Sequence, residues 1–390
     1  MRREKSRFRT VENLSLAPRF DESAKIPARK KPRVLMVGMH LTKTRGGIST
    51  LTAQILESSL RDDFEFDYIE SQAEDFGKFG KLFLGLRAIG RFLLNCIRTP
   101  PEIVYVHLGS NASLYRESFF IVLAKFFGRK VVVHFHAGDF DNYYPQQSRA
   151  GQMFIRRAIN RSDYLIAVSN ESAGKLRKLV DAPLIVVVPN AIDTTVFADG
   201  RNEIRADDAV RLLFVGAIGK LKGERDLIRA LQILRSRGCE FDLKVSFLGY
   251  GAETLKPLCE AAGIADWIEF AGAVALDERI EFFQRADIFV LPTYAEAMPM
   301  SIIEAMAANL AIVSTNVGGI PELIENEVDG LLFTPGDAED LTNKIAFLVE
   351  NKTVRLTLGA KAGTKAREHF DFRGYVEKLR GHLFEMSERK

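Results

Sequence analysis

Two glutamates, Glu296 and Glu304, are separated by seven residues in the segment EAMPMSIIE, which follows the apolar run DIFVLP. Pro299 suits the first turn of a helix and disfavours helix before it, so we expect a helix to begin near Met300. The backbone N–H groups of Met300 and Ser301 would then form an anion site at the positive end of the helix dipole. A phosphate could rest there while the carboxylates accept hydrogen bonds from hydroxyls on either side, which is the layout of a nucleotide sugar. The alternative is a helix with an acidic neighbour and an ordinary surface glutamate.

Three glycine-rich turns follow predicted strands, in FVGAIGKLKG (214–223), FLGYGAETL (247–255) and GMHLTKTRGGIST (38–50). Glycine lets a backbone approach a phosphate, a ribose or a base closely. The third turn lacks the lysine of a P-loop and the spacing of a dinucleotide-binding fingerprint, so neither class of protein is supported. In the second turn, Gly249 and Gly251 allow close backbone approach to a base or a ribose, and a lone G-x-G is weak evidence for a site.

Two lysines, Lys220 and Lys222, lie in the first of these turns. A diphosphate leaving group needs compensating positive charge, and a lysine ammonium supplies a compact charge without demanding bidentate geometry. We therefore expect both lysines near the diphosphate. The alternative is a pair of solvated lysines in a surface loop.

Histidines alternate in the apolar segment VVVHFHAGDF, so the side chains of His134 and His136 share one side of a predicted strand. With Asp139 they could belong to the metal site of a hydrolase. The later histidines, His369 and His382, lie near the C-terminus, and no acidic cluster completes a ligand set. A metal-dependent hydrolase is therefore the weaker hypothesis, and a core histidine satisfied by the backbone is an alternative that fits His134 better than His136.

Short strands rich in β-branched residues must position these side chains, and helical patterns separate most of the strands. A first series is predicted at 33–38, 103–108, 131–136, 164–169 and 184–189, and a second at 210–216, 242–249, 268–274, 287–292, 310–315 and 330–335. Continuous apolar strands alternating with helices indicate parallel sheets covered on both faces. The predicted fold class is α/β, with two Rossmann-like doubly wound parallel-sheet domains facing a cleft, and ligands bind beyond the carboxyl ends of such strands.

Composition limits the functional class. A chain of 390 residues is long enough for two domains, and its three widely spaced cysteines predict no disulfide framework, which favours a cytoplasmic protein. Residues 1–33 hold eleven Lys/Arg and four Asp/Glu, a local charge of +7. We expect a disordered basic arm without an apolar secretory core, and attraction to an anionic membrane surface is its alternative role.

The segment FGKFGKLFLGLRAIGRFLLNCIR, residues 76–98, carries five basic residues and no acidic one. Apolar residues recur in it at helical spacing, which predicts a helix. This helix either packs on its own domain with a solvated basic face or rests on a membrane interface, and no run of 18 uncharged apolar residues predicts a span.

These pieces resemble the retaining glycosyltransferases of family 4 (glycosyl transferases group 1), which have the GT-B fold, over residues 33–372. The segment ADIFVLPTYAEAMPMSIIEAMAANLAIVSTNVGGIPELI is similar to the family's donor-site signature, and PNAIDTTVF resembles its interdomain element. TRGGIST, KG at 222–223 and GYGAE fall where the family has comparable loops. The resemblance implies a hexosyltransferase-type enzyme of class EC 2.4.

The resemblance also implies roles on the donor side. Glu304 would bind the ribose hydroxyls of the nucleotide, and the amides of Met300 and Ser301 its diphosphate. Glu296 would contact hydroxyls of the donor sugar near the reacting carbon, and Lys222 would neutralise the diphosphate. The resemblance thus implies a donor site in the second half of the chain. The further residues expected to line it are Gly216, Lys220, Gly249, Tyr250 and Gly251.

On the acceptor side, Gly46 and Gly47 would form the loop that approaches the donor. His136 matches the histidine that hydrogen-bonds the donor sugar from that side. The implied catalytic residues are therefore His136, Glu296 and Lys222.

Departures from the family pattern lie close to the site. Ala217 stands where the family usually has an arginine, so either Lys220 takes over that charge or the leaving group is stabilised less strongly. After Glu296 the family usually has Gly-Phe/Leu-Gly/Pro, whereas this chain has Ala297, Met298 and Pro299. Asn309 and Ala191 replace common family glycines at positions that we expect to be tolerant.

Four parts of the chain are expected. They are a basic arm (1–32), an acceptor-side domain (33–195), a nucleotide-sugar-binding domain (196–372) and a C-terminal helix (373–390) packing back on the first domain. No D-x-D motif lies in a nucleotide loop, so we predict no required metal ion and no cofactor.

The predicted reaction is retaining transfer from a nucleotide sugar, with UDP favoured, to a glycan or a polyprenyl-diphosphate-linked acceptor in surface polysaccharide or lipopolysaccharide biosynthesis. We expect a cytoplasmic protein, peripheral on the inner face of the membrane, with no nucleic-acid partner. A soluble acceptor and a catalytically silent nucleotide-sugar-binding protein are the alternatives.

Overall fold

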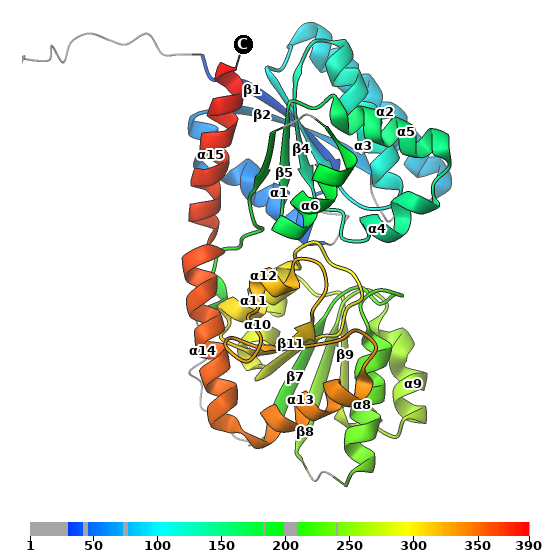
Figure 1. Ribbon diagram of the computed structural model, residues 1–390, viewed down its shortest axis with the longest axis vertical. Helices are drawn as coiled ribbons and strands as arrows, with labels where there is room; N and C mark the ends of the chain where they lie inside the picture. The colour runs from blue at the N-terminus through cyan, green and yellow to red at the C-terminus, as the bar shows by residue number, and fades with distance from the viewer. Residues whose placement is uncertain are drawn as a thin grey trace, which may run out of the picture. The chain divides into compact units, whose positions relative to one another are not determined.

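Two parallel sheets of six strands each organise residues 32–390, which form one compact unit of the computed structural model (Figure 1). The structure describes residues 30–41, 46–72, 77–181, 184–198, 209–238 and 241–389. The predicted basic arm therefore lies almost wholly outside the described residues, and so does part of the predicted loop at 38–50.

The first sheet has the strand order β2-β1-β3-β4-β5-β6. Its strands are β1 Arg33–Met39, β2 Glu65–Gln72, β3 Ile103–Leu108, β4 Lys130–Phe135, β5 Tyr164–Ala167 and β6 Leu184–Val187. The five predicted strands are confirmed, whereas β2 was not predicted. It is an edge strand that pairs only with β1 and carries several charged residues, so it lacks the continuous apolar run of a central strand.

The second sheet has the order β12-β11-β10-β7-β8-β9. Its strands are β7 Val210–Val215, β8 Leu243–Leu248, β9 Ile268–Gly272, β10 Ile288–Leu291, β11 Ala311–Thr315 and β12 Leu331–Phe333. All six predicted strands of the second series are confirmed. The inner strands β10 and β11 are fully buried, as an interior parallel sheet requires, whereas the edge strand β9 is partly exposed.

Helices connect these strands. Those of the first half are α1 Gly47–Glu57, α2 Lys78–Arg98, α3 Ala112–Phe126, α4 Phe140–Tyr143, α5 Arg149–Asn160, α6 Asn170–Leu179 and α7 Thr195–Ala198. Those of the second half are α8 Glu224–Ser236, α9 Lys256–Ala261, α10 Leu276–Arg285, α11 Met300–Ala307, α12 Ile320–Leu323, α13 Ala338–Glu350, α14 Lys352–His369 and α15 Phe372–Glu388. Short 3₁₀ helices are η1 Ser59–Asp62, η2 Tyr144–Gln146, η3 Ala252–Leu255 and η4 Ala265–Trp267.

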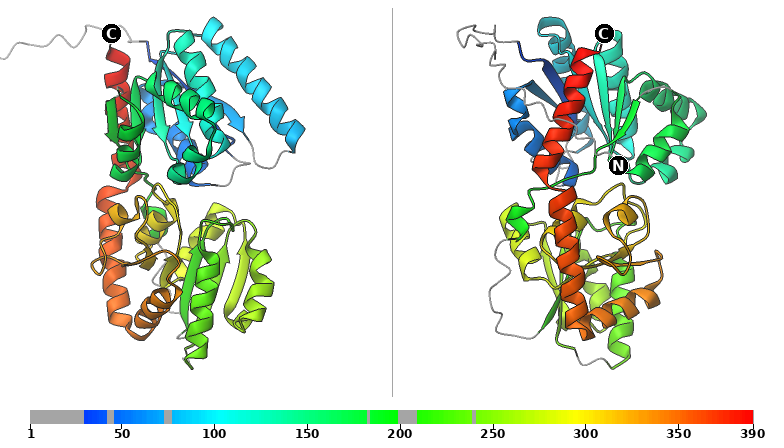
Figure 2. Two further views of the ribbon diagram at one scale, coloured as in Figure 1. Left: turned by 45° about the vertical axis from the view of Figure 1, so that its right-hand side comes forward. Right: turned by 60° about the vertical axis from the view of Figure 1, so that its left-hand side comes forward.

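The last helix, α15, packs against elements of the first half of the chain (Figure 2). The rings of Phe384 and Phe64 are 4.8 Å apart, and the hydroxyl of Tyr164 lies 2.6 Å from Nδ1 of His382. Arg380 donates to the carboxylate of Asp63 at 2.9 Å. Apolar residues of α15 thus share one core with the sheet face that is not covered by α2, α3 and α5.

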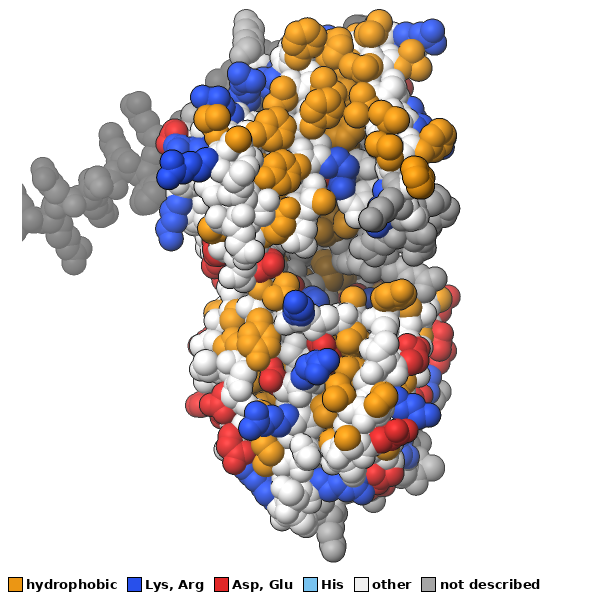
Figure 3. All heavy atoms as spheres, turned by 90° about the vertical axis from the view of Figure 1, so that its right-hand side faces the viewer, with side chains coloured by type: hydrophobic (Ala, Val, Ile, Leu, Met, Phe, Trp, Pro, Cys, Tyr) orange, Lys and Arg blue, Asp and Glu red, His pale blue; other side chains and the backbone are white. Residues whose placement is uncertain are grey.

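Helix α2 is only partly packed on its sheet. Its C-terminal half buries Phe92 in the core that α3 and α5 share. Its first turns instead leave Phe79, Leu82, Phe83 and Leu86 between 61% and 90% exposed. Hydrophobic side chains gather on this side of the molecule, with Lys and Arg among them (Figure 3). Within the described ranges, no helix is both long and apolar enough to cross a bilayer.

Candidate active site

Helix α11 begins at Met300, with Pro299 as the residue before its first turn, as the sequence predicts. The N–H groups at the start of a helix have no intrahelical acceptor, so those of Met300 and Ser301 are available to an anion. Met300 itself is buried, and the side chain of Ser301 is half-buried. The predicted helix start is therefore confirmed and lies close to the protein core, and its use as an anion site stays a prediction.

The first glutamate of the motif, in the loop after β10, forms an ion pair with a lysine in the loop after the neighbouring strand β7. The ammonium group of Lys222 donates to Oε1 of Glu296. The side chain of Glu296 is 13% exposed and that of Lys222 is 31% exposed, so the pair is partly shielded from water. The structure therefore brings together a cation and a carboxylate that are 74 residues apart in the chain.

The second glutamate has a partner that the sequence did not indicate. Arg279 of α10 donates to Oε2 of Glu304, whose side chain is only 8% exposed. No spacing rule connects an arginine of α10 with a glutamate of α11, so only the packing of the two helices reveals the pair. The guanidinium group provides charge compensation for a carboxylate that would otherwise be buried alone.

The loops after β7 and β8 lie side by side. The N–H of Gly216 donates to the carbonyl of Leu248, and that of Ile218 to the carbonyl of Tyr250, at 2.9 and 3.0 Å. Tyr250 is 80% exposed. The remaining predicted residues of these loops are Lys220, which is exposed, and Gly249 and Gly251, which flank Tyr250.

Backbone segments from the two halves of the chain meet at Glu296. A Cβ atom at Gly138, just after β4, would lie 2.6 Å from the backbone nitrogen of Ala297. Gly318 has a φ of +56°, and a Cβ there would lie 1.7 Å from the carbonyl oxygen of Glu296. Only glycine permits both approaches, so the loop that carries Glu296 is held between a turn of the first half and the GG segment of the second.

The predicted acceptor-side glycines precede and open helix α1. Gly46 has extended backbone and is its N-cap, and Ser49 Oγ donates to the carbonyl of Gly46 at 2.8 Å. Gly47 packs directly against the side chain of Met300, because a Cβ atom at Gly47 would lie 2.4 Å from its Cγ. The glycine loop of the first half thus reaches the start of α11, while residues 42–45 lie outside the described part.

His136 belongs to a buried group of three histidines, of which the sequence analysis found only two. His107 on β3 pairs in register with His134 on β4, and its Nδ1 lies 3.2 Å from Nε2 of His136. Burial lowers the pKa of His107 to about 3, and burial with neighbouring histidines holds those of His134 and His136 well below their ordinary values. All three imidazoles are therefore neutral at pH 7.

The predicted H-x-H-x-x-D arrangement is not assembled as the hydrolase alternative required. Asp139 accepts a hydrogen bond from the Nδ2 group of Asn142 at 2.7 Å and does not belong to the histidine group. Among the described residues, the three histidines are the only His, Cys, Asp or Glu side chains grouped closely enough to share an ion. The signal that could have found His107 is the sequence IVYVHL, a second predicted strand with a histidine near its carboxyl end.

Glu322 is a further residue to which the sequence analysis assigned no role. Its carboxylate accepts hydrogen bonds from the backbone N–H groups of Asn170 and Glu171, at 2.9 and 3.0 Å, at the start of α6. Nearby, the side-chain amide of Asn190 donates to the carbonyl of Met298 at 2.8 Å. Both contacts join the first half of the chain to the segments around Glu296.

One of the positions expected to be tolerant has a backbone conformation that few residues adopt. Asn309 has a φ of +54°, a conformation that glycine adopts freely and asparagine tolerates better than most residues. Ala191, by contrast, is not among the described residues with positive φ, so alanine there needs no special conformation.

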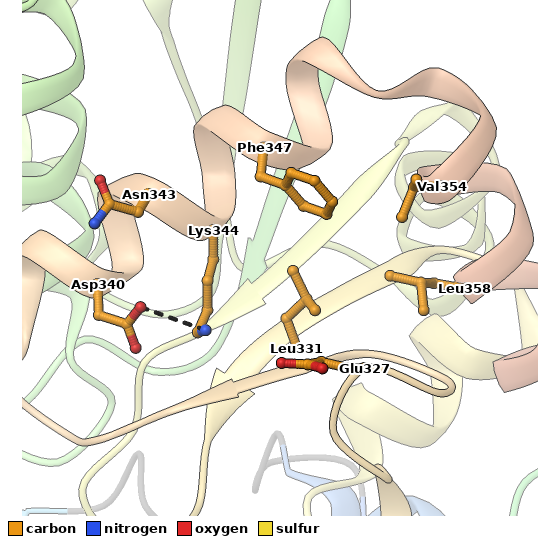
Figure 4. A pocket seen from close by; sticks show the side chains of 8 residues that line it. All are labelled: Glu327, Leu331, Asp340, Asn343, Lys344, Phe347, Val354 and Leu358. Carbon is orange, nitrogen blue, oxygen red and sulfur yellow. Dashed lines mark ion pairs between the residues drawn. The ribbon is translucent and has the colours of Figure 1, made fainter.

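A separate pocket of about 360 Å³ lies between β12, α13 and α14 (Figure 4). Asp340, Lys344 and Phe347 of α13 line it, and Lys344 pairs with Asp340 at 3.3 Å. None of the predicted site residues lines this pocket. It is therefore distinct from the site around Glu296.

Known proteins resemble the chain over both halves. The model of the glycosyl transferases group 1 matches residues 198–369, and that of Glycosyltransferase Family 4 matches residues 55–196. The chain is 32% identical over 235 residues to a D-inositol 3-phosphate glycosyltransferase of Arthrobacter sp. (strain FB24), covering 57% of this chain and 55% of that protein. It is 32% identical over 182 residues to the amylovoran biosynthesis glycosyltransferase AmsK of Erwinia amylovora, covering 44% of each.

These matches span about half the length of the curated relatives. A solved structure shows the same fold over a larger share: HepE of Anabaena, in complex with UDP and glucose, has a TM-score of 0.70 at 16% identity, covering 91% of this chain and 100% of that one. This is the GT-B fold, with two Rossmann-like halves. Because the two family models together cover both halves, the chain belongs to glycosyltransferase family 4, the glycosyl transferases group 1.

Proposed function

We propose that the protein transfers a sugar, with retention of configuration, from a nucleotide sugar to a glycan or a polyprenyl-diphosphate-linked acceptor. The observation that carries this proposal is the Lys222–Glu296 ion pair, formed by the loop that leads into the free amides of α11. This arrangement offers positive charge and a carboxylate at the point where a sugar joins a diphosphate. UDP is the favoured nucleotide, and the UDP bound in HepE supports that choice.

The chemistry follows from where charge develops. When the bond between the anomeric carbon and the diphosphate oxygen breaks, negative charge appears on the departing diphosphate. Lys222 and the amides of Met300 and Ser301 would stabilise that charge without a required metal ion or other cofactor. The acceptor oxygen attacks the same face of the sugar, and its proton passes to the departing phosphate oxygen. Glu296 would hold hydroxyls of the donor sugar beside the reacting carbon.

The nucleotide would occupy the loops of the second half. Glu304 would accept hydrogen bonds from the ribose hydroxyls, and its pairing with Arg279 holds the carboxylate in place. The residues proposed to line the rest of the donor site are Gly216, Lys220, Gly249, Tyr250 and Gly251. From the first half, Gly46, Gly47 and His136 would approach the donor sugar and the acceptor.

The proposed division of the chain has an acceptor-side domain (33–195) and a nucleotide-sugar-binding domain (196–372). It is supported by the two family matches, which meet at residues 196–198. The segment 373–390 is assigned to the first domain because α15 contacts Tyr164 of β5 and Asp63 at the end of η1. The basic arm, 1–32, is proposed as a separate part.

The proposed acceptor is carried at a membrane. Helix α2 leaves four large apolar side chains exposed in its first turns and has no acidic residue. Burying such side chains in a lipid interface gains about 1.5–3 kcal/mol each, and neighbouring Lys and Arg add about 1 kcal/mol each on an anionic surface. This supports a peripheral protein on the cytoplasmic face that uses a lipid-linked acceptor in surface polysaccharide biosynthesis, in line with the name of AmsK.

A soluble acceptor is the second candidate. The name of the Arthrobacter relative specifies a small polyol phosphate, which needs no membrane. The two candidates differ in one observable, because only a lipid-linked acceptor requires a lipid fraction for turnover.

The test is nucleotide release by the full chain from a panel of UDP-, GDP- and ADP-sugars, with EDTA present and with either lipid extract or D-inositol 3-phosphate as acceptor. Release from one donor that rises with lipid extract supports the proposal, whereas a rise with the polyol phosphate alone supports the second candidate. The proposed chemistry would be contradicted if no donor released its nucleotide, or if activity returned only with added metal. The variant Glu304→Gln, which preserves side-chain size, should release far less nucleotide.

A further inference from the structure

Three histidines converge on one side of the first sheet, and the proposed function uses only one of them, His136. His134 and His136 are two residues apart on and just after β4, and His107 lies opposite His134 on the neighbouring strand. All three are buried, with relative exposures of 3%, 0% and 8% for His107, His134 and His136. One ring nitrogen from each residue lies within 4.8 Å of those of the other two.

The separation of two of these nitrogens matches that of metal ligands. Nδ1 of His107 and Nε2 of His136 are 3.2 Å apart. Two nitrogens bound to zinc at about 2.0–2.1 Å in tetrahedral geometry are about 3.3 Å apart. The third ring, His134, contacts the Tyr105 hydroxyl through Nδ1 at 2.8 Å, which leaves its Nε2 facing no hydrogen-bond partner among the described residues.

Hydroxyl groups contact two of the rings. In metal sites, hydrogen-bond partners of this kind orient the histidines that bind the ion. Tyr105 contacts His134, and Thr52 Oγ1 lies 3.4 Å from Nε2 of His107. A partner on one ring nitrogen fixes the tautomer and directs the other nitrogen to the ion. Burial keeps the rings neutral, which is the form that binds a metal.

We propose that His107, His134 and His136 form a binding site for one divalent transition-metal ion, with zinc the best match. Three neutral imidazoles with no carboxylate suit a borderline-soft ion and disfavour magnesium and calcium, which take oxygen ligands. His136, the most exposed of the three and the one at the carboxyl end of β4, provides the route of entry.

Occupation of this site has a consequence that rests on the proposed function. His136 is also the residue proposed to hydrogen-bond the donor sugar. An ion on Nε2 of His136 excludes a sugar hydroxyl from that nitrogen, so zinc should compete with a donor sugar that is bound through Nε2. The metal is thus an inhibitor of the proposed reaction and not a requirement for it.

The first experiment measures zinc binding without any reference to turnover. The full chain is stripped with EDTA, dialysed and titrated with Zn²⁺ against a chromogenic chelator, and Co²⁺ is then used to look for the visible spectrum of a tetrahedral site. We expect one tight site per chain. His107→Gln should remove it, and Tyr105→Phe, which keeps all three ligands, should weaken it about tenfold or more. His369→Gln, at an exposed histidine outside the group, should leave it unchanged.

Each outcome has a meaning. Zinc binding that is equally strong in His107→Gln and in His369→Gln, or no binding in the wild type, overturns the site. If His107→Gln fails to fold, an unchanged zinc affinity in Tyr105→Phe overturns it instead. If zinc binds to the three histidines but the protein turns over no donor, the metal site is supported and the proposed function is contradicted. If zinc at a concentration equal to its measured Kd does not reduce donor turnover, zinc does not compete with the donor.

Discussion

Glu322 and Asn170 join the two halves of the chain. Oε2 of Glu322 accepts hydrogen bonds from the backbone N–H of Asn170 at 2.9 Å and from its side-chain amide at 2.8 Å. The carboxylate sits at the start of α6, where free N–H groups and the helix dipole favour negative charge. The PE pair after Gly318 and Gly319 therefore has a structural role, because it fixes the segment that follows β11 against a helix of the first half.

Replacing Glu322 with alanine should destabilise the protein. The variant Glu322→Ala loses the carboxylate that caps α6, and loss of a capping group costs about 1–2 kcal/mol. Urea denaturation followed by circular dichroism measures the free energy of unfolding. Glu325→Ala, at an exposed glutamate of the same segment, should stay within about 0.5 kcal/mol of the wild type. Equal effects of the two variants would show that the cap contributes nothing.

Alanine at Gly138 should disturb the contact with the Glu296 loop. The added Cβ would lie 2.6 Å from the backbone nitrogen of Ala297, and overpacking of this kind costs about 1–3 kcal/mol. We expect Gly138→Ala to lower both the free energy of unfolding and the donor turnover. Gly174→Ala in α6, where a Cβ meets nothing within 4 Å, should be neutral or stabilising. Wild-type stability of Gly138→Ala would mean that the two loops can separate freely.

Loss of the Glu304 carboxylate should weaken nucleotide affinity. A hydrogen bond to a charged group contributes about 1.5–3 kcal/mol, so Glu304→Ala should raise the Kd for UDP about tenfold or more. Lys222→Ala should raise it less and should chiefly reduce turnover, because Lys222 is assigned to the departing diphosphate. Isothermal titration calorimetry measures both affinities. Glu281→Gln, an exposed glutamate paired with Arg285 on α10, is the matched control. Equal UDP affinity in wild type and Glu304→Ala would remove the assignment of Glu304.

The exposed face of α2 should bind anionic lipid. The double variant Leu82→Glu, Phe83→Glu removes two apolar side chains and introduces repulsion, so co-sedimentation with vesicles that contain phosphatidylglycerol should fall about tenfold or more. Binding should also weaken as salt screens the basic residues. Leu356→Glu, at a half-exposed leucine of α14, should not change vesicle binding. Equal binding of the double variant and the wild type would exclude this face as the contact.

Acid should destabilise the metal-free protein through His107. Burial lowers the pKa of this histidine from 6.5 to about 3, with His134, His136 and Tyr105 around it. Between these values the unfolded chain binds a proton that the folded chain does not, so the stability from this group is present above pH 6.5 and falls as the pH drops. The loss is about 1.4 kcal/mol per pH unit.

Urea denaturation of wild type and His107→Gln between pH 6.5 and 4.5, with EDTA present, tests this dependence. The free energy of unfolding should fall less steeply with decreasing pH in the variant, because the titration of one buried histidine has been removed. Identical slopes would show that His107 already binds a proton in the folded protein.

Local sequence rules were sufficient for most of the fold. Most interior strands of the two sheets are largely apolar runs, because they are covered on two faces, and such runs are visible without any knowledge of tertiary contacts. The start of α11 was predicted because Pro299 restricts the backbone on its own. Strand β2 was missed because an edge strand with charged residues lacks that continuous run.

The sequence by itself thus determined two parallel sheets and the glutamate pair that follows a buried strand. Tertiary structure alone decided the partners of the charged and polar side chains: Arg279 for Glu304, Glu322 for the start of α6, and His107 for the histidines of β4. The physical reason is that periodicity and turn rules act within a few residues. Side-chain partners depend on strand register and helix packing, which bring together residues far apart in the chain.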